Sequence, residues 1–286
     1  MLRSVLELLR PANVVTAFAD VLAGFSAAGL QNGRALPWLL AATACLYAGG
    51  VVLNDVFDRA VDRVERPERP IPSGRVPVQV AAGLGAALLA SGVLSAFQAT
   101  AQAGVIATAI ASLVLMYDAW GKRHPLVGPV NMALCRAANL LLGVAAVPEA
   151  LRGSWRLGLI PLFYISGVTV LSRGEVHGGT RRIATAALVL VSVAVTGLLF
   201  LALRSENVAV AVLLAVVVMW RVVPPFWRAR LAPGADTIRS AVRNGVLSLV
   251  LVDATIASAY AGPLYAASIL AIGVAAGLLA RRFAVT

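Results

Sequence analysis

The stretch Asn54-Asp55-Val56-Phe57-Asp58-Arg59-Ala60-Val61-Asp62-Arg63 directly follows an apolar run from about Pro37 to Leu53. If the helix predicted for that run continues, Asp55, Asp58 and Asp62 share one face, because they are spaced i, i+3 and i+7. Three carboxylates on one face repel each other, and nearby lipid raises their free energy further. A cation such as Mg²⁺ would offset both effects, since its ligands are carboxylate, water and phosphate oxygens. The alternative is a solvated helix end with arginine partners, but acids at membrane depth are usually functional.

The composition of the chain is that of a membrane protein. Its 286 residues are 60% hydrophobic and 13% charged, with a mean hydropathy of +0.87. Soluble globular domains do not have these values, whereas helical membrane proteins with several spans do. The net charge of +11 does not indicate a nucleic-acid partner, because the basic residues cluster in alternate loops without interleaved aromatic residues.

Ten apolar segments are long enough to cross a membrane. They predict an all-α, polytopic transmembrane bundle of nine to ten helices, in a single domain over residues 1–286. Abundant small residues, including 25 glycines, would let these helices approach closely. The segments lie near residues 12–30, 37–57, 77–97, 102–118, 126–147, 157–172, 183–203, 206–222, 243–260 and 262–281.

The basic residues predict how the bundle is oriented. With the N-terminus on one side, alternate loops place 19 of the 24 basic residues on that same side. The positive-inside rule then makes this side cytoplasmic, most simply in a bacterial inner membrane. The segments assigned to it are the N-terminus, 58–76, 119–125, 173–182, 223–242 and Arg281-Arg282.

The pattern Asn-Asp-x-x-Asp-x-x-x-Asp at 54–62, followed by the Pro- and Arg-rich segment 66–76, resembles the first signature of the UbiA superfamily of intramembrane prenyltransferases. Arg10-Pro11-Ala12-Asn13 resembles the RPxN start of that family's first helix. The segment 117–123 resembles its Tyr-x-x-x-x-Lys-Arg loop. The resemblance implies a helix bundle around a central cavity, usually of nine helices.

The resemblance also implies roles for individual residues. Metal binding would fall to Asp55, Asp58, Asp62 and Glu175, with Asp55, Asp58 and Lys122 as catalytic residues and Mg²⁺ as the cofactor. For Lys122 and the arginines, ordinary ion pairing or topology-setting charge is an open alternative. The implied substrate-binding residues are Asn13, Asn54, Arg63, Arg69, Tyr117, Arg123, Asn131, Arg173 and His177.

Several polar residues lie within the predicted spans. Such residues generally face a bundle interior or a cavity. For Asp20 and Arg136, a mutual salt bridge is at least as plausible as a substrate contact. Asp253 has no functional interpretation at this stage.

The segment Ser172-Arg173-Gly174-Glu175-Val176-His177-Gly178-Gly179 occupies the position of the family's second aspartate-rich motif. That motif normally holds two or more acids, whereas here Glu175 is the only one. Arg173, His177 and close approach of the glycines could compensate by binding diphosphate directly. The alternative is a flexible turn in which Glu175 pairs with an arginine. The segment also resembles the UbiA-like members encoded in bacterial ebo operons.

These observations predict Mg²⁺-dependent transfer of a prenyl group from an isoprenyl diphosphate to a hydrophobic, most simply aromatic, acceptor. Expected partners are therefore these two substrates and membrane lipid. Two alternatives stay open. One is a terpene cyclase with the same metal site and no acceptor. The other is a non-catalytic relative that binds or transports lipid, which the weak second motif favours and the complete first motif opposes.

Overall fold

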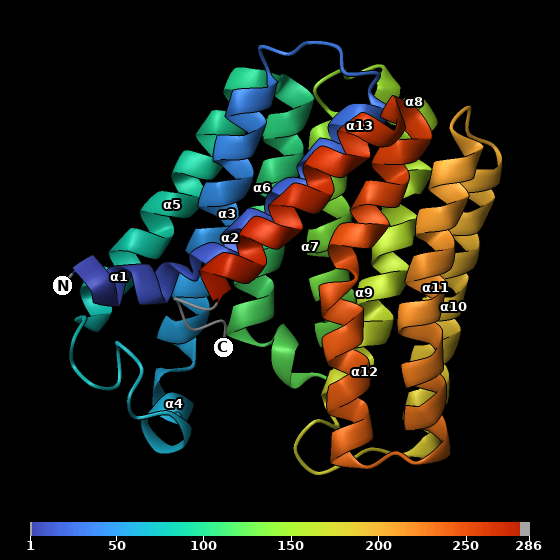
Figure 1. Ribbon diagram of the computed structural model, residues 1–286. Helices are drawn as coiled ribbons and strands as arrows, with labels where there is room; N and C mark the ends of the chain where they lie inside the picture. The colour runs from blue at the N-terminus through green and yellow to red at the C-terminus, as the bar shows by residue number, and fades with distance from the viewer. Residues whose placement is uncertain (1, 281–286) are drawn as a thin grey trace.

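The computed structural model describes residues 2–280, and every regular element in that range is helical (Figure 1). This confirms the predicted all-α class. The elements are α1 (Leu2–Leu9), α2 (Pro11–Ala27), α3 (Leu36–Phe57), α4 (Arg59–Glu65), α5 (Val78–Ala99), α6 (Ala101–Ala119), η1 (Gly121–Arg123), α7 (Val127–Val144), α8 (Ala150–Ser154), η2 (Trp155–Gly158), α9 (Leu159–Ser172), α10 (Arg181–Leu203), α11 (Val208–Leu231), α12 (Ala235–Leu247) and α13 (Leu249–Ala280).

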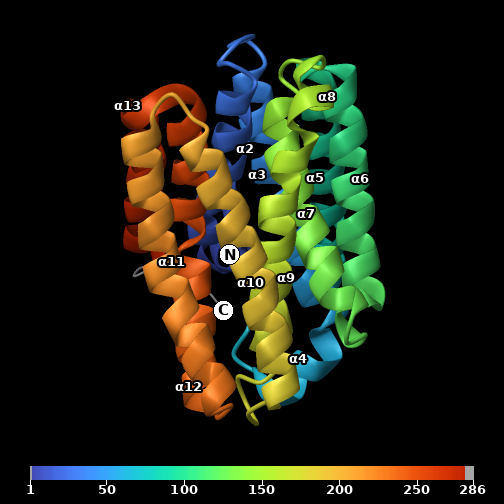
Figure 2. The same ribbon diagram turned by 90° about the vertical axis from the view of Figure 1, so that its right-hand side faces the viewer.

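Eight stretches of the described residues are long and apolar enough to cross a membrane. The 17-residue α2 is slightly shorter and lies within the bundle beside them (Figure 2). The last stretch, Ala235–Leu279, reverses at Gly262 and therefore crosses twice. Counted this way, the described residues make ten passes, one for each apolar segment of the sequence. The protein is an integral membrane protein.

Gly262 reverses the chain within α13. Its φ of 82° lies in the left-handed region, which glycine adopts without the steric cost of a side chain. Pro263 then suits the start of the second arm, where a missing N–H is tolerated. The parts of α13 before and after Gly262 lie side by side and run antiparallel. Their closeness is seen at Gly273, where a Cβ would lie 2.9 Å from the Val250 side chain. The second arm packs on α2, where the Tyr265 hydroxyl donates to the Leu22 carbonyl at 3.2 Å.

Two apolar cores lie side by side in the bundle. The larger one contains Tyr164 and Phe226 and is built by α2, α7 and α9–α13. The other contains Leu39 and Leu142 and is built by α2, α3 and α5–α7. Because α2 and α7 contribute to both cores, they form the seam between the two halves, as Figure 2 shows.

The segments predicted to share one side of the membrane meet at one end of the bundle (Figure 1). Arg173 hydrogen-bonds the η1 backbone there, and the Gly179 amide donates to the Pro233 carbonyl at 2.9 Å. At the opposite end, the Asn32 side chain donates to the Ala146 carbonyl at 2.9 Å. The predicted grouping of loops is confirmed for the described residues. Arg281 and Arg282 lie outside them, and the side that faces the cytoplasm stays a prediction.

Three predicted boundaries are wrong. Residues 223–242 are mostly helical, because α11 continues through Pro224 and Pro225 to Leu231 and α12 begins at Ala235. A proline within a membrane helix removes one hydrogen bond, which neighbouring groups can replace. The span predicted at 243–260 breaks at Ser248, between α12 and α13. Residues 59–65, predicted as the start of a mobile loop, form α4.

Glycines allow α2 and α7 to touch backbone to backbone at the seam. A Cβ on Gly143 would collide with the Val21 carbonyl oxygen, and one on Gly24 with the Leu140 carbonyl oxygen. Backbone atoms cannot move aside as side chains do. The close approach of these helices therefore depends on glycine at both positions.

We expect Gly143→Ala to separate α2 from α7 and to destabilise the protein by about 1–3 kcal/mol, the usual cost of overpacking. Gly83→Ala in α5 is the matched control, because its Cβ would meet no atom within 4 Å. Thermal unfolding of both purified variants in detergent measures the effect. Equal midpoints for the two variants would show that the α2–α7 seam tolerates a methyl group.

Candidate functional site

Asp55 lies in the last turn of α3 and is held by two arginines that are distant in sequence. Arg10 Nη2 lies 2.7 Å and Arg69 Nη1 3.4 Å from Asp55 Oδ1. The Asp55 side chain is only 6% exposed. Arg10 reaches it from the junction of α1 and α2, where its φ of 45° turns the backbone just before Pro11. The carboxylate is therefore buried, but paired with cations.

Arg69 also binds Asp62 and so clamps the two acids together. Arg69 Nη1 lies 2.8 Å from Asp62 Oδ2. α3 ends at Phe57, and α4 restarts the helix with the Asp62 amide donating to the Asp58 carbonyl at 2.9 Å. Asp62 is therefore buried in an ordered helix, and the expected mobile position for it is wrong.

Asp58 faces a second group of polar side chains. Lys122 Nζ lies 2.7 Å from Asp58 Oδ1 and 3.8 Å from Asp118 Oδ1. The Asn54 side-chain amide donates to Asp118 Oδ1 at 2.7 Å. The 117–123 loop thus joins the 54–62 motif through direct contacts, and the acids of α3 and α4 meet cations from three other segments.

The donor set of this cluster fits a magnesium-bound phosphate group. Its ligand atoms are carboxylate oxygens, which Mg²⁺ prefers, and the Asp58 side chain is the most accessible of the acids, at 27% exposed. Lys122 Nζ is buried and, despite its closeness to Asp58, has no hydrogen-bond partner of acceptable geometry. Because an ammonium has three donors, Lys122 can stay ion-paired with Asp58 and still donate to an incoming oxygen. Among the described residues, however, no three His, Cys, Asp or Glu side chains already converge as a metal-binding group.

Five other predicted site residues lie around this cluster with different degrees of exposure. Asn131 is buried beneath η1, and its amide nitrogen has no hydrogen-bond partner. Tyr117 is half-buried and interacts electrostatically with Asp58 and Arg173. Asn13 is half-buried in the first turn of α2, whereas Arg63 and Arg123 are exposed.

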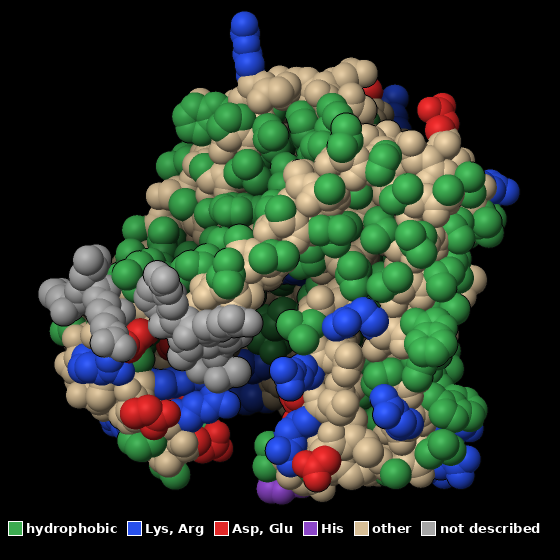
Figure 3. Space-filling model, in the orientation of Figure 1, with side chains coloured by type: hydrophobic (Ala, Val, Ile, Leu, Met, Phe, Trp, Pro, Cys, Tyr) green, Lys and Arg blue, Asp and Glu red, His purple; other side chains and the backbone are tan. Residues whose placement is uncertain are grey.

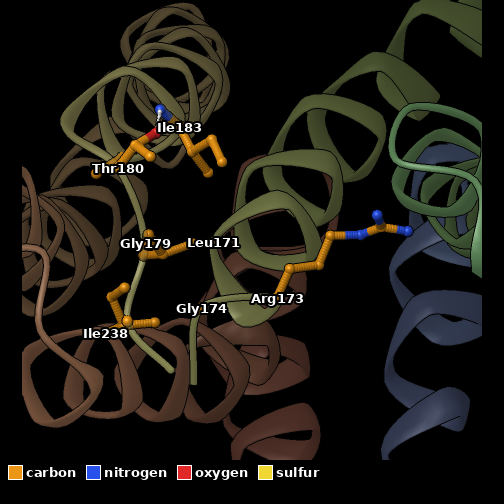
Figure 4. A pocket seen from close by; sticks show the side chains of 9 residues that line it. Leu171, Arg173, Gly174, Gly179, Thr180, Ile183 and Ile238 are labelled. Atoms are coloured by element: carbon orange, nitrogen blue, oxygen red, sulfur yellow. Dashed lines mark hydrogen bonds between the residues drawn. The ribbon is translucent and has the colours of Figure 1, made fainter. Parts of the chain in front are cut away.

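The 172–180 segment packs against the turn between α11 and α12. Gly178 has a φ of 78°, and a Cβ there would lie 3.0 Å from the Pro233 carbonyl. A pocket of about 70 Å³ forms beneath this segment (Figure 4). Its lining is mostly apolar and includes Leu171, Ile183 and Ile238. These glycines therefore line this mostly apolar pocket and pack the segment against Pro233.

Arg173 points away from that pocket in Figure 4. Its Nη2 donates to the carbonyls of Lys122, at 3.0 Å, and His124, at 2.7 Å. It thereby ties the second-motif segment to η1. His177 is exposed.

Glu175 is half-buried and stands apart from the other acids. No ion pair joins it to Arg173 or Arg181 among the described residues; the cation that acts on it is Arg239 of α12. Burial raises the pKa of the Glu175 carboxyl above its ordinary value, and Arg239 partly opposes that shift.

A second polar network lies deeper in the bundle. Arg136 Nε lies 3.0 Å from Asp20 Oδ2, and the Asn139 amide donates to the same oxygen at 2.8 Å. Asn139 in turn accepts from the Thr43 hydroxyl at 2.7 Å. The salt bridge predicted between Asp20 and Arg136 is therefore present, and Asp253 interacts with both residues.

Sequence reasoning missed two members of the site, Arg10 and Asp118. Arg10 was assigned only to the start of a helix, and Asp118 only to the matched segment 117–123. The signal for both was a polar residue immediately next to a matched motif at the end of an apolar span.

A wide opening separates the two halves of this end of the molecule (Figure 3). Lys and Arg side chains gather on both of its sides, over α12 on one and near α4 on the other. Acidic side chains are interspersed among them. The opening lies at the end of the bundle that carries α4 and α12.

Comparison with known proteins matches residues 13–174 to the UbiA prenyltransferase family. A digeranylgeranylglyceryl phosphate synthase from Ignicoccus hospitalis is 36% identical over 178 residues, covering 62% of this chain and 58% of that protein. One from Methanopyrus kandleri is 36% identical over 156 residues, covering 54% of this chain and 57% of that protein. The chain thus matches somewhat more than half the length of these curated relatives.

Solved structures show the same fold. A structure described as digeranylgeranylglyceryl phosphate synthase in membranes has a TM-score of 0.72 at 20% identity, covering 91% of this chain and 98% of that one. A UbiA homologue from Aeropyrum pernix K1 has a TM-score of 0.65 at 16% identity, covering 85% and 96%. Since the family match spans more than half of the chain and includes the whole acidic cluster, this protein belongs to the UbiA prenyltransferase family.

Proposed function

We propose that the protein transfers a prenyl group from an isoprenyl diphosphate to a hydrophobic acceptor within the membrane. The observation that carries this proposal is the convergence of Asp55, Asp58 and Asp62 with Arg10, Arg69 and Lys122 at the mouth of an apolar bundle. An anionic headgroup and an apolar tail would each meet a suitable environment there. A UbiA homologue from Archaeoglobus fulgidus, with a TM-score of 0.54, is described as bound to GPP and Mg²⁺.

The cations and acids of the cluster have complementary roles in this proposal. Mg²⁺, when bound, would be held by the carboxylates of Asp55, Asp58 and Asp62 and would neutralise charge on the leaving diphosphate. Lys122, which pairs with Asp58, can also donate to a phosphate oxygen. Arg10 and Arg69 pair with Asp55 and Asp62, which offsets the repulsion between these two carboxylates and holds them in position.

The reaction breaks the bond between the allylic carbon and the diphosphate oxygen, and the diphosphate leaves with the electron pair. The acceptor then forms a bond to that carbon and loses a proton. Apolar helices exclude the water that would otherwise capture the allylic cation. The curated relatives' names indicate a product that contains glyceryl phosphate, so an aromatic acceptor is one of several candidates for this chain.

We further propose that the end bearing the site faces the cytoplasm, as in a bacterial inner membrane. The support is the excess of arginine and lysine on that end.

Alanine at Asp55, Asp58 or Asp62 should lower Mg²⁺-dependent diphosphate release from geranyl diphosphate at least about 100-fold, because each change removes a ligand and one ion-pair partner of a neighbouring cation. Asp62→Ala should be as severe as the others, since Arg69 clamps it to Asp55. Glu65→Ala, an exposed acid on α4, is the matched control. Release of a cyclic hydrocarbon or cyclic alcohol without acceptor would instead indicate a cyclase, and full activity of Asp58→Ala would reject the site.

Glu175→Gln keeps the size of the side chain and removes its charge. If Glu175 helps to bind diphosphate-bound Mg²⁺, the concentration of Mg²⁺ for half-maximal activity should rise several-fold while the maximum survives. Glu206→Gln, an exposed acid at the opposite end, should leave the titration unchanged. An unshifted titration for Glu175→Gln would show that it is not a ligand.

Cysteine labelling tests the orientation. In a background with Cys45 and Cys135 replaced by serine, Glu206→Cys should react with a membrane-impermeant maleimide in intact cells. Glu68→Cys, also exposed but at the site end, should react only after permeabilisation. The reverse pattern would place the site outside the cytoplasm.

A further inference from the structure

A basic hollow lies between α11 and α12, on elements that carry none of the acidic cluster. Its volume is about 660 Å³, which lies in the range of small-molecule sites. Half of the residues that line it are arginines. The lining comprises Arg221, Arg239, Ser240, Arg243, Asn244 and Leu247.

Arg221 is the least expected member of this hollow, because it lies within a membrane-spanning helix and is exposed. It stands ten residues before the end of α11 at Leu231, which corresponds to about 15 Å of helix. Its Nε donates to the Ser248 hydroxyl at 3.4 Å, a weak contact for a full charge. A charged side chain at such depth generally has an ionic partner or a functional ligand.

Arg239 and Arg243 add two more cations on one face of α12, since they are spaced i, i+4. Among the described residues, the ion pair made by the three arginines of the hollow is that of Arg239 with Asp236, at 2.8 Å. The Asp236 side chain is 94% exposed, so water screens that pair and it contributes little. Arg239 also interacts electrostatically with the half-buried Glu175. Arg221 and Arg243 form no ion pair among the described residues, so the hollow keeps the positive charge of these two arginines.

We propose that this hollow binds the phosphomonoester headgroup of a lipid. Guanidinium groups bind phosphate oxygens through paired, charge-assisted hydrogen bonds. A phosphomonoester carries about 1.5 to 2 negative charges, which suits this positive charge better than the single charge of a diester. Ser240 and Asn244 supply further hydrogen-bonding groups beside the arginines.

The apolar surroundings assign the ligand to lipid. Leu247 lines the hollow and is 57% exposed, its neighbour Val246 is 50% exposed, and Trp220 beside Arg221 is 75% exposed. A tail attached to the headgroup can therefore lie along apolar side chains next to the charged ones. This site goes beyond the proposed prenyl transfer and does not depend on it.

Binding of oleoyl lysophosphatidic acid, a glycerol phosphomonoester with one tail, tests the site. Native mass spectrometry of the full chain in an uncharged detergent gives its Kd. We expect Arg221→Gln and Arg243→Gln each to raise the Kd about tenfold, since each removes one charge-assisted contact. Arg228→Gln is the matched control, because Arg228 is an exposed arginine of α11 that does not line the hollow.

Other ligands separate the possible sources of binding. Monoolein, which lacks the phosphate, should bind at least about tenfold more weakly. An affinity for inorganic phosphate equal to that for oleoyl lysophosphatidic acid would overturn the assignment of the ligand as a lipid. An equal affinity for phosphatidylglycerol, a phosphodiester, would overturn its assignment as a phosphomonoester. Geranyl diphosphate with Mg²⁺ should bind the variants and the wild type alike. If the variants also lost affinity for geranyl diphosphate, the hollow would be part of the acidic site and not a separate site. If Arg221→Gln does not fold, Arg243→Gln carries the test, and a Kd equal to that of Arg228→Gln overturns the proposal.

Discussion

Buried carboxylates at one end of an apolar bundle impose the constraint around which this site is organised. The Asp55, Asp62 and Asp118 side chains are each at most 6% exposed. A buried charge is costly unless it is paired and hydrogen-bonded, and no single segment of the chain supplies enough partners. Arg10, Arg69 and Lys122 therefore come from three regions separated by long helices. The bundle must close accurately for these contacts to form, which couples the helix packing to the charge balance of the site.

Interruptions in the helices lie where the fold brings charged segments together. α3 gives way to α4 at Asp58, and the change of direction lets Asp62 reach Arg69. α12 gives way to α13 at Ser248, whose hydroxyl accepts from Arg221. Away from these breaks, the seam between α2 and α7 is formed by backbones in contact across Gly24 and Gly143. Rigid packing in the membrane thus supports irregular backbone at the end that carries the polar groups.

The sequence predicted the parts of this arrangement that depend on local pattern. Ten apolar segments correspond to ten passes. The first motif is only partly as predicted, because Arg69 joins Asp55 to Asp62 while Asp58, at the break between α3 and α4, pairs with Lys122. The partners of those acids were less predictable, because contacts such as Arg10 with Asp55 depend on how distant helices pack. The predicted span ends at residue 222, yet α11 continues through Pro224 and Pro225. The second motif also differed, since Gly178 packs against Pro233 through long-range contacts that its glycine pattern does not specify.

The energetics of the cluster argue against a non-catalytic role for it. Replacing a buried ion pair by apolar residues of similar volume is often neutral or stabilising by about 1–4 kcal/mol. A protein that only packed lipid would thus gain nothing in stability from Asp55, Asp62 and their arginines. Lys122 adds to this argument, because its buried ammonium pairs with Asp58 and has further donors available. A site with buried acids and such a cation is suited to an anionic ligand accompanied by a metal ion, and a diphosphate with Mg²⁺ meets that requirement.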